Sequence, residues 1–231
     1  MRLILPVTAL LTVISHAAGL DALIGEFQAD RRDLSNSPAV SWTPDSRERE
    51  DALLTTWEKR LDTLDYDSLD PTARIDWHLL RTSLQERRDD IVLQRKRFQE
   101  IEPLLAFSPP LQALTTALSN HQLADAAKSA GVLAKASADV KDLRKKLEAG
   151  HAKDAPADSL KPTPVIALRT ADAIEELRTS LENWYSLYDG FQPDFTWWNR
   201  QPYGSLTADL NGLKEHTAQR QATGPTTRAT P

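Results

Sequence analysis

Apolar side chains recur every three or four residues along most of the chain, and alternating strand-like runs are missing. This spacing places the apolar side chains on one face of an α-helix, because a helix turns once in 3.6 residues. Residues 20–31 form the first such segment, and residues 44–64 form the second. The pattern predicts an all-α protein, a bundle of about six to seven helices, several of them long, with no sheet.

The expected helix boundaries rest on prolines, glycines and small polar residues. Thr43, Asp70 and Thr163 each stand directly before a proline. In this arrangement the polar side chain caps the helix and proline takes the first helical position, where its missing N–H costs nothing. Gly150 and Gly190 follow the last apolar positions of their segments and predict helix ends.

The longest predicted helix begins after Asp70 and runs almost to Pro103. Its expected inward-facing stripe consists of Ile75, Leu79, Leu80, Leu84, Ile91 and Phe98. Further helices are expected over residues 110–120, 122–150, 164–189 and 204–215, and residues 151–164 form the expected internal linker.

The first residues have the pattern of a secretory signal peptide. Arg2 precedes an apolar run of about a dozen residues, and Ser15 and Ala17 stand three and one before an expected cleavage site. We therefore predict a signal peptide over 1–17, a single helical domain over 18–216 and a disordered tail over 217–231. The protein is expected to be exported, to the periplasm or an extracellular space. The run is shorter than the roughly 20 residues that span a bilayer, so no stable membrane span is expected.

Composition narrows the classes of function. The net charge is −5, and Lys and Arg are scattered along the predicted helical faces. A nucleic-acid partner is therefore not expected. The chain of 231 residues is long enough for a sizeable core without disulfides. It contains no cysteine, which excludes thiol catalysis and Cys-ligated zinc or iron–sulfur centres.

No motif in the sequence predicts a catalytic or metal site. A helical zinc site typically places two histidines at positions i and i+4, whereas His78, His121, His151 and His216 each stand alone in their segments. The chain also has no G-x-S-x-G motif and no Gly-rich phosphate loop. We predict no catalytic residue, no metal site and no cofactor, and we interpret the histidines and paired carboxylates as ordinary surface or structural groups.

Aromatic residues cluster between Trp184 and Tyr203, where eight of the fifteen in the chain occur. One interpretation is that large rings attach a helix end and a proline-shaped turn to the long third helix, which is expected to begin after Asp70. The other is a wall that binds a peptide or a glycan, with Asp194 or Asn199 orienting a polar group. The wall would consist of Trp184, Tyr188, Phe195, Trp197, Trp198 and Tyr203.

Two stretches carry a resemblance to a known family. RIDWHLLR at 74–81 and NWYSLYDGFQPDFTWWNRQPYGSLTADL at 183–210 resemble the N-terminal helical half of the exported bacterial family called domain of unknown function 885. The most specific part is the FTWW-x-x-x-PY pattern, and the similarity extends to about residue 215. Members of this family resemble zinc metallopeptidases.

The family's presumed zinc-binding element, a His-Glu followed by Pro-Gly-His, does not occur in this sequence. No catalytic or metal-binding residue therefore carries over. The resemblance implies a truncated, non-catalytic N-terminal region that forms one wall of a substrate cleft, with a missing catalytic half or a covering protein as its partner. A stand-alone binding module for peptide or glycan is the alternative, and a hydrolase with an unrecognised site is a third.

Overall fold

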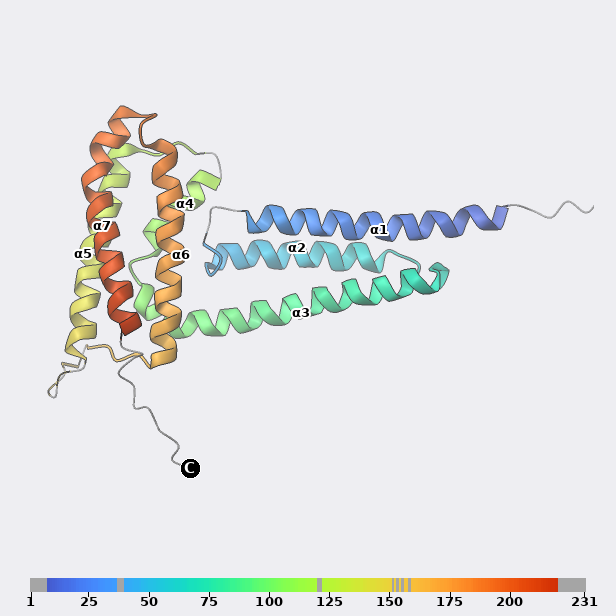
Figure 1. The fold of residues 1–231 in the computed structure, drawn as a ribbon, viewed down its shortest axis with the longest axis horizontal. Coiled ribbons are helices and arrows are strands. Elements are labelled where there is room, and N and C mark those ends of the chain that lie inside the picture. The colour runs from blue at the N-terminus through green and yellow to red at the C-terminus, as the bar shows by residue number, and fades with distance from the viewer. Residues whose placement is uncertain are drawn as a thin grey trace, which may run out of the picture. The chain divides into compact units, whose positions relative to one another are not determined.

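A computed structural model describes residues 8–36, 40–119, 122–150, 152, 154, 156–157 and 159–219. Within these ranges the regular secondary structure is helical throughout, so the all-α prediction is confirmed (Figure 1). The α-helices are α1 (Thr8–Ser35), α2 (Pro44–Asp62), α3 (Pro71–Ile101), α4 (Pro109–Ser119), α5 (Ala126–Ala149), α6 (Pro164–Tyr188) and α7 (Pro193–Gln219). Two short 3₁₀ helices, η1 (Tyr66–Ser68) and η2 (Glu102–Leu105), flank α3.

Several predictions concern residues that the structure does not describe. Residues 1–7 of the expected signal peptide and residues 220–231 of the expected tail lie outside the described ranges, as do His121 and His151. Helix α1 runs through the expected cleavage position after residue 17. The signal peptide, the tail and export stay predictions. None of the described helices carries an apolar stretch long enough to cross a membrane.

The predicted helix boundaries agree with the structure at four places. An Asp70 carboxylate oxygen accepts a hydrogen bond from the Ala73 N–H at 2.9 Å, and α3 begins at Pro71. Thr163 caps α6 by accepting from the Ile166 N–H. Gly150 follows the last residue of α5. Gly190, two residues beyond the end of α6, has a φ of 81°, a conformation that glycine adopts without steric cost.

The chain forms two compact units. Among the described residues, the first comprises 8–36 and 44–95, and the second comprises 40–43 and those from 96 to 219. The division falls inside α3 rather than in the expected linker at 151–164. Two compact units can still unfold as one cooperative domain, so the single domain over 18–216 stays a prediction.

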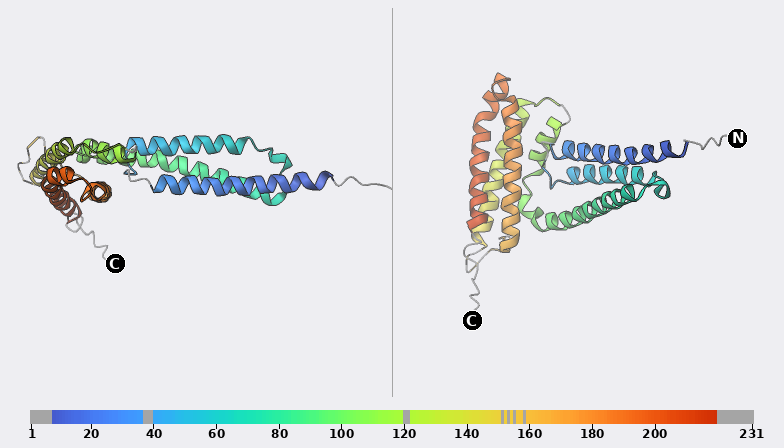
Figure 2. Two further views of the ribbon diagram at one scale, coloured as in Figure 1. Left: turned by 90° about the horizontal axis from the view of Figure 1, so that it is seen from above. Right: turned by 45° about the vertical axis from the view of Figure 1, so that its right-hand side comes forward.

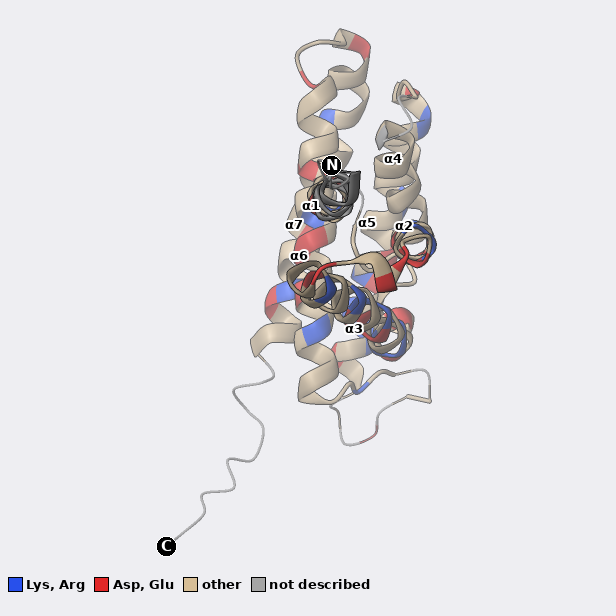
Figure 3. Ribbon diagram, turned by 90° about the vertical axis from the view of Figure 1, so that its right-hand side faces the viewer, with Lys and Arg blue, Asp and Glu red and all other residues tan. Residues whose placement is uncertain are grey.

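In the first unit, α1, α2 and α3 lie beside one another, and each runs in the opposite direction to the one before it (Figures 1 and 2). Phe27 of α1 meets Trp57 of α2 edge to face, with ring centroids 5.5 Å apart. The indole N–H of Trp57 donates to Asp30 of α1 at 3.0 Å. Charged residues of both signs lie along α2 and α3 (Figure 3), where they pair across the helices, as in the ion pair between Arg81 and Asp62.

The predicted inward stripe of α3 is partly wrong. Leu80, Leu84 and Ile91 are buried, but Ile75 and Leu79 are 61% and 63% exposed. Ile75 precedes Leu84 by nine residues, or two and a half helical turns, so the two side chains point in opposite directions. The predicted stripe therefore combined apolar residues from two different faces of α3.

In the second unit, α7 packs along α5 and α6, and α4 lies against α5 and α6. Helices α5 and α7 are parallel, because Asn199 contacts Ala126 near the start of both helices and Asp209 contacts Ser137 further along both. The buried face of α5 carries small side chains that allow this close approach, namely Ser129, Ala130, Ala136 and Ser137.

Candidate functional site

The aromatic stretch is helical, which corrects the expectation of a proline-shaped turn. Helix α7 begins at Pro193 and continues through the tryptophans to Gln219, so the short helix expected over 204–215 is only its second half. Pro193 takes the favourable first position of a helix. Pro202 lies inside the helix and cannot donate to the Trp198 carbonyl four residues earlier. The burial of neighbouring side chains holds this segment helical despite the lost hydrogen bond.

Three of the six residues of the predicted wall belong to the core of the second unit. Trp184, Tyr188 and Phe195 are 1%, 6% and 0% exposed. Phe195 lies 5.2 Å from the Trp184 ring and 5.0 Å from the Tyr188 ring, centroid to centroid. The Tyr188 hydroxyl donates to the Gln122 carbonyl oxygen at 3.1 Å. These rings join α6 to α7, and no ligand reaches them in this conformation.

Tyr203 is partly buried at the edge of the core. Its ring stacks on that of Tyr185 with centroids 3.9 Å apart and planes 2° from parallel. Burial raises the pKa of both phenols above the usual value, so both stay neutral at ordinary pH. The pair is a second contact between α6 and α7.

The remaining two residues of the predicted wall are exposed. Trp197 is 75% exposed and Trp198 is 47% exposed, and their rings meet almost at right angles with centroids 4.9 Å apart. We call these two residues the tryptophan corner. Leu187 and Phe191, which the sequence analysis did not include in the wall, are also exposed at the same junction of α6 and α7. Phe191 lies between the two helices, directly after Gly190. Its place after a helix-ending glycine was the feature of the sequence that could have predicted its exposure.

A hydrogen-bonded turn supports the tryptophan corner. The Gly190 N–H donates to the Thr196 hydroxyl at 3.1 Å, and that hydroxyl donates to Asp189 at 2.8 Å. The Gln192 N–H donates to the Tyr188 carbonyl at 3.1 Å. The exposed rings therefore stand on a turn that is fixed to the buried part of the aromatic cluster.

The polar residues expected to orient a ligand are in different surroundings. Asn199 is fully buried, and its amide donates to the carbonyls of Ala126 and Phe195 at 3.0 Å each. It joins α5 to α7 and is not available to a ligand, so the expectation is wrong for Asn199. Asp194 is exposed in the first turn of α7, close in sequence to the tryptophan corner.

No cluster of three or more His, Asp or Glu side chains suited to a metal occurs among the described residues. His78 is exposed, and its Nε2 lies 2.9 Å from the Tyr66 hydroxyl. His216 lies in the last turn of α7. The interpretation of the histidines as surface or structural groups stays a prediction.

The charged side chains that line a pocket in the first unit form ion pairs with one another. Arg88 donates to both carboxylate oxygens of Glu58 at 2.7 Å and to Asp51 at 2.6 Å. The hydrogen bonds with Glu58 raise the pKa of Arg88, and the same bonds lower the pKa of Glu58. Arg81 lines the same pocket and pairs with Asp62. These groups connect α2 to α3, and each of the three carboxylates is already paired with an arginine.

Comparison of the chain with protein-family models, with curated proteins and with solved structures finds no match. The resemblance to the domain of unknown function 885 family therefore rests on the two stretches of sequence that carry it.

Proposed function

We propose that this chain is the non-catalytic helical region of an exported metallopeptidase-like protein, and that the tryptophan corner packs against the catalytic region. In this proposal the second unit forms one wall of the substrate cleft. Catalytic groups and metal ligands belong to the part of the protein that carries the family's His-Glu and Pro-Gly-His element, which is absent from this sequence.

The observation that carries the proposal is the coincidence of two features. The FTWW-x-x-x-PY pattern is the most specific part of the resemblance, and it is also where large apolar side chains are exposed. Its Phe195 is buried and its Tyr203 stacks on Tyr185, which anchors the segment. Trp197 and Trp198 face outward from that anchor. Exposed apolar patches mark surfaces that interact with other molecules, and in this proposal the partner is the catalytic region.

The decisive experiment compares this chain with the protein as its own organism exports it. The intact mass of the exported protein is expected to exceed that of the present chain by a catalytic region. In that longer protein, oxidative footprinting should show Trp197 and Trp198 protected, whereas both should react in the isolated chain. A mass equal to this chain without its leader, or equal reactivity of both tryptophans in the two proteins, contradicts the proposal.

A stand-alone binding module is the second candidate, and the geometry of the tryptophan corner favours it. Two exposed indole rings at right angles offer a stacking face to a sugar or to an aromatic or cationic side chain. Under this alternative, adding a glycan or peptide ligand shifts the tryptophan fluorescence of the isolated chain. Trp197→Ala should abolish the shift without changing the urea midpoint, because the side chain is mostly exposed. A shift that survives in Trp197→Ala contradicts this candidate.

A further inference from the structure

The tryptophan corner adjoins an exposed carboxylate. Asp194 lies in the first turn of α7, three residues before Trp197 and four residues before Trp198. Residues at these spacings are neighbours on the surface of a helix, with Cβ atoms about 5–6 Å apart. Long side chains on a helix also lean towards its N-terminus. Both indoles therefore point towards the turn that carries Asp194.

The polar groups of the corner have no partner among the residues that the structure describes. Within those residues the Asp194 carboxylate forms no ion pair and accepts no hydrogen bond, and neither indole N–H donates one. No cation of the described chain lies over the ring of Trp197 or Trp198, and their one ring contact is with each other. The carboxylate also interacts favourably with the N-terminal end of α7, but this interaction leaves its oxygens open to a ligand.

The charge around the corner is negative. Two acidic residues and one basic residue occur from 187 to 201, which gives a net charge of −1. Asp189 belongs to the hydrogen-bonded turn below the corner. Arg200 lies about 120° around the helix axis from Asp194. Burial raises the pKa of Tyr185 and the charge of Arg200 partly opposes this increase, so Arg200 lies towards Tyr185.

We propose that the tryptophan corner binds an arginine side chain, and that this arginine belongs to the catalytic region. A guanidinium is planar, so it stacks on an indole face while its N–H groups reach the Asp194 carboxylate. Leu187 and Phe191 are exposed at the same junction and offer an apolar surface around the arginine. A sugar ring also stacks on an indole, but it does not neutralise the carboxylate. The site is argued from the corner itself, whereas the identity of the partner rests on the proposed function.

The test titrates the 231-residue chain with Nα-acetylarginine amide and follows the indole N–H signals by NMR. The signals missing in Trp197→Ala and in Trp198→Ala assign the two tryptophans. Both signals should shift, with a dissociation constant on the order of 30 mM. Nα-acetylcitrulline amide is the matched neutral probe, and sodium chloride keeps the ionic strength equal. It should bind at least about fivefold more weakly, because it lacks the positive charge.

Three results of this titration would overturn the proposal. The first is the absence of any shift up to about 100 mM of the arginine probe. The second is a shift of equal size with the citrulline probe. The third is a shift of equal size with maltotriose, which would make the corner a glycan site.

A pair of variants tests the part of the carboxylate. Asp194→Asn should weaken binding of the arginine probe about threefold, because it removes one exposed ion pair. Asp172→Asn is the matched control, since Asp172 is an exposed carboxylate of α6 about 22 Å along the helix from Leu187. Equal effects of the two substitutions would mean that only the net charge of the chain matters, and would overturn the site.

Failure of this inference is distinguishable from failure of the proposed function. If the probe does not bind while Trp197 and Trp198 are protected in the longer protein, the arginine site is wrong and the proposed function stands. If the probe binds while the exported protein has no additional mass, the arginine site stands and the catalytic region is not its partner.

Discussion

At the scale of single residues, Gly150 allows the backbone near Leu160 to pack directly against the end of α5, because glycine has no side chain. We expect Gly150→Ala to lower the free energy of unfolding by about 1–3 kcal/mol, the usual cost of forcing an atom into a filled space. A Cβ at Gly150 would lie 2.2 Å from the carbonyl oxygen of Leu160, so the added methyl would meet backbone rather than a flexible side chain. Urea denaturation gives the measurement.

Gly131 provides the matched control for this prediction. It lies inside α5, and a Cβ there would meet nothing within 4 Å. Gly131→Ala should therefore stabilise the protein by about 0.5–1 kcal/mol, because alanine is the better helix former. Equal effects of the two substitutions would show that helix propensity, and not the contact with Leu160, decides the result.

Glu175 is the residue whose ionisation should make stability depend on pH. Hydrogen bonds from Arg178 and Lys214 lower its pKa to about 2. A carboxylate with a lowered pKa in the folded state stabilises the protein above its unfolded pKa near 4.5, and this contribution is lost as the pH falls from there towards 2.

The measurement is the urea midpoint of the wild type and of Glu175→Gln at several pH values. The wild type should have the higher midpoint near pH 6, and the difference should shrink between about pH 4.5 and 2. The side chain is 41% exposed, so solvent screens the effect and the difference should be small. A difference that is constant with pH would mean that the carboxylate charge contributes nothing.

At the scale of elements, the junction of α6 and α7 divides its aromatic residues between core and surface. We expect Trp184→Ala to cost about 3–5 kcal/mol, because the side chain is fully buried between aromatic neighbours. Trp197→Ala should change stability by no more than about 0.5 kcal/mol, because most of its ring faces solvent.

These two substitutions remove the same side chain from adjacent helices. The difference between their free energies of unfolding therefore measures the contribution of burial. Urea denaturation of both variants measures it. A large loss of stability in Trp197→Ala would mean that its ring packs against the protein, and the tryptophan corner would then no longer be a candidate binding surface.

The beginnings and ends of the helices show what local patterns can and cannot predict. The signals at Pro71, Pro164 and Gly190 were interpreted correctly, because caps and left-handed turns depend on neighbouring residues. The prolines at 193 and 202 predict a proline-shaped turn, and this prediction is wrong because both lie in α7. Contacts of Phe195 and Asn199 with α5 and α6 hold that segment helical, and no local pattern reports such contacts.

At the scale of the whole molecule, the two compact units have separate cores. The buried cluster around Trp57 and Leu84 shares no residue with the cluster around Leu177 and Phe195. We therefore expect Leu84→Ala to speed amide hydrogen exchange in residues 20–95 and to leave α5–α7 unchanged. Leu177→Ala should do the reverse.

Hydrogen exchange followed by mass spectrometry resolves the two regions. Each substitution removes a fully buried leucine and should cost about 2–5 kcal/mol locally. If either variant speeds exchange equally in both regions, the chain unfolds as one cooperative domain, as the sequence analysis expected for residues 18–216.

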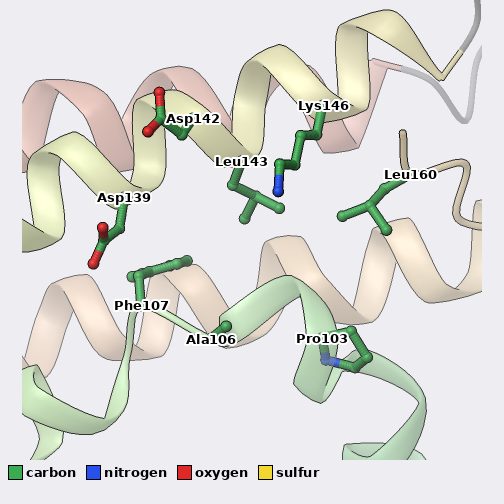
Figure 4. A pocket seen from close by; sticks show the side chains of 8 residues that line it. All are labelled: Pro103, Ala106, Phe107, Asp139, Asp142, Leu143, Lys146 and Leu160. Carbon is green, nitrogen blue, oxygen red and sulfur yellow. The ribbon is translucent and has the colours of Figure 1, made fainter. Parts of the chain in front are cut away.

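The sequence by itself determined the helical class, most helix starts and the presence of an aromatic cluster, because these depend on spacing and on neighbouring residues. Only the tertiary structure decided which of the aromatic residues are exposed. It also placed Ile75 on the surface and brought Leu160 to a pocket in the second unit that Pro103 and Lys146 also line (Figure 4). Burial and pocket formation depend on contacts between residues far apart in the chain, and the order of residues alone does not specify those contacts.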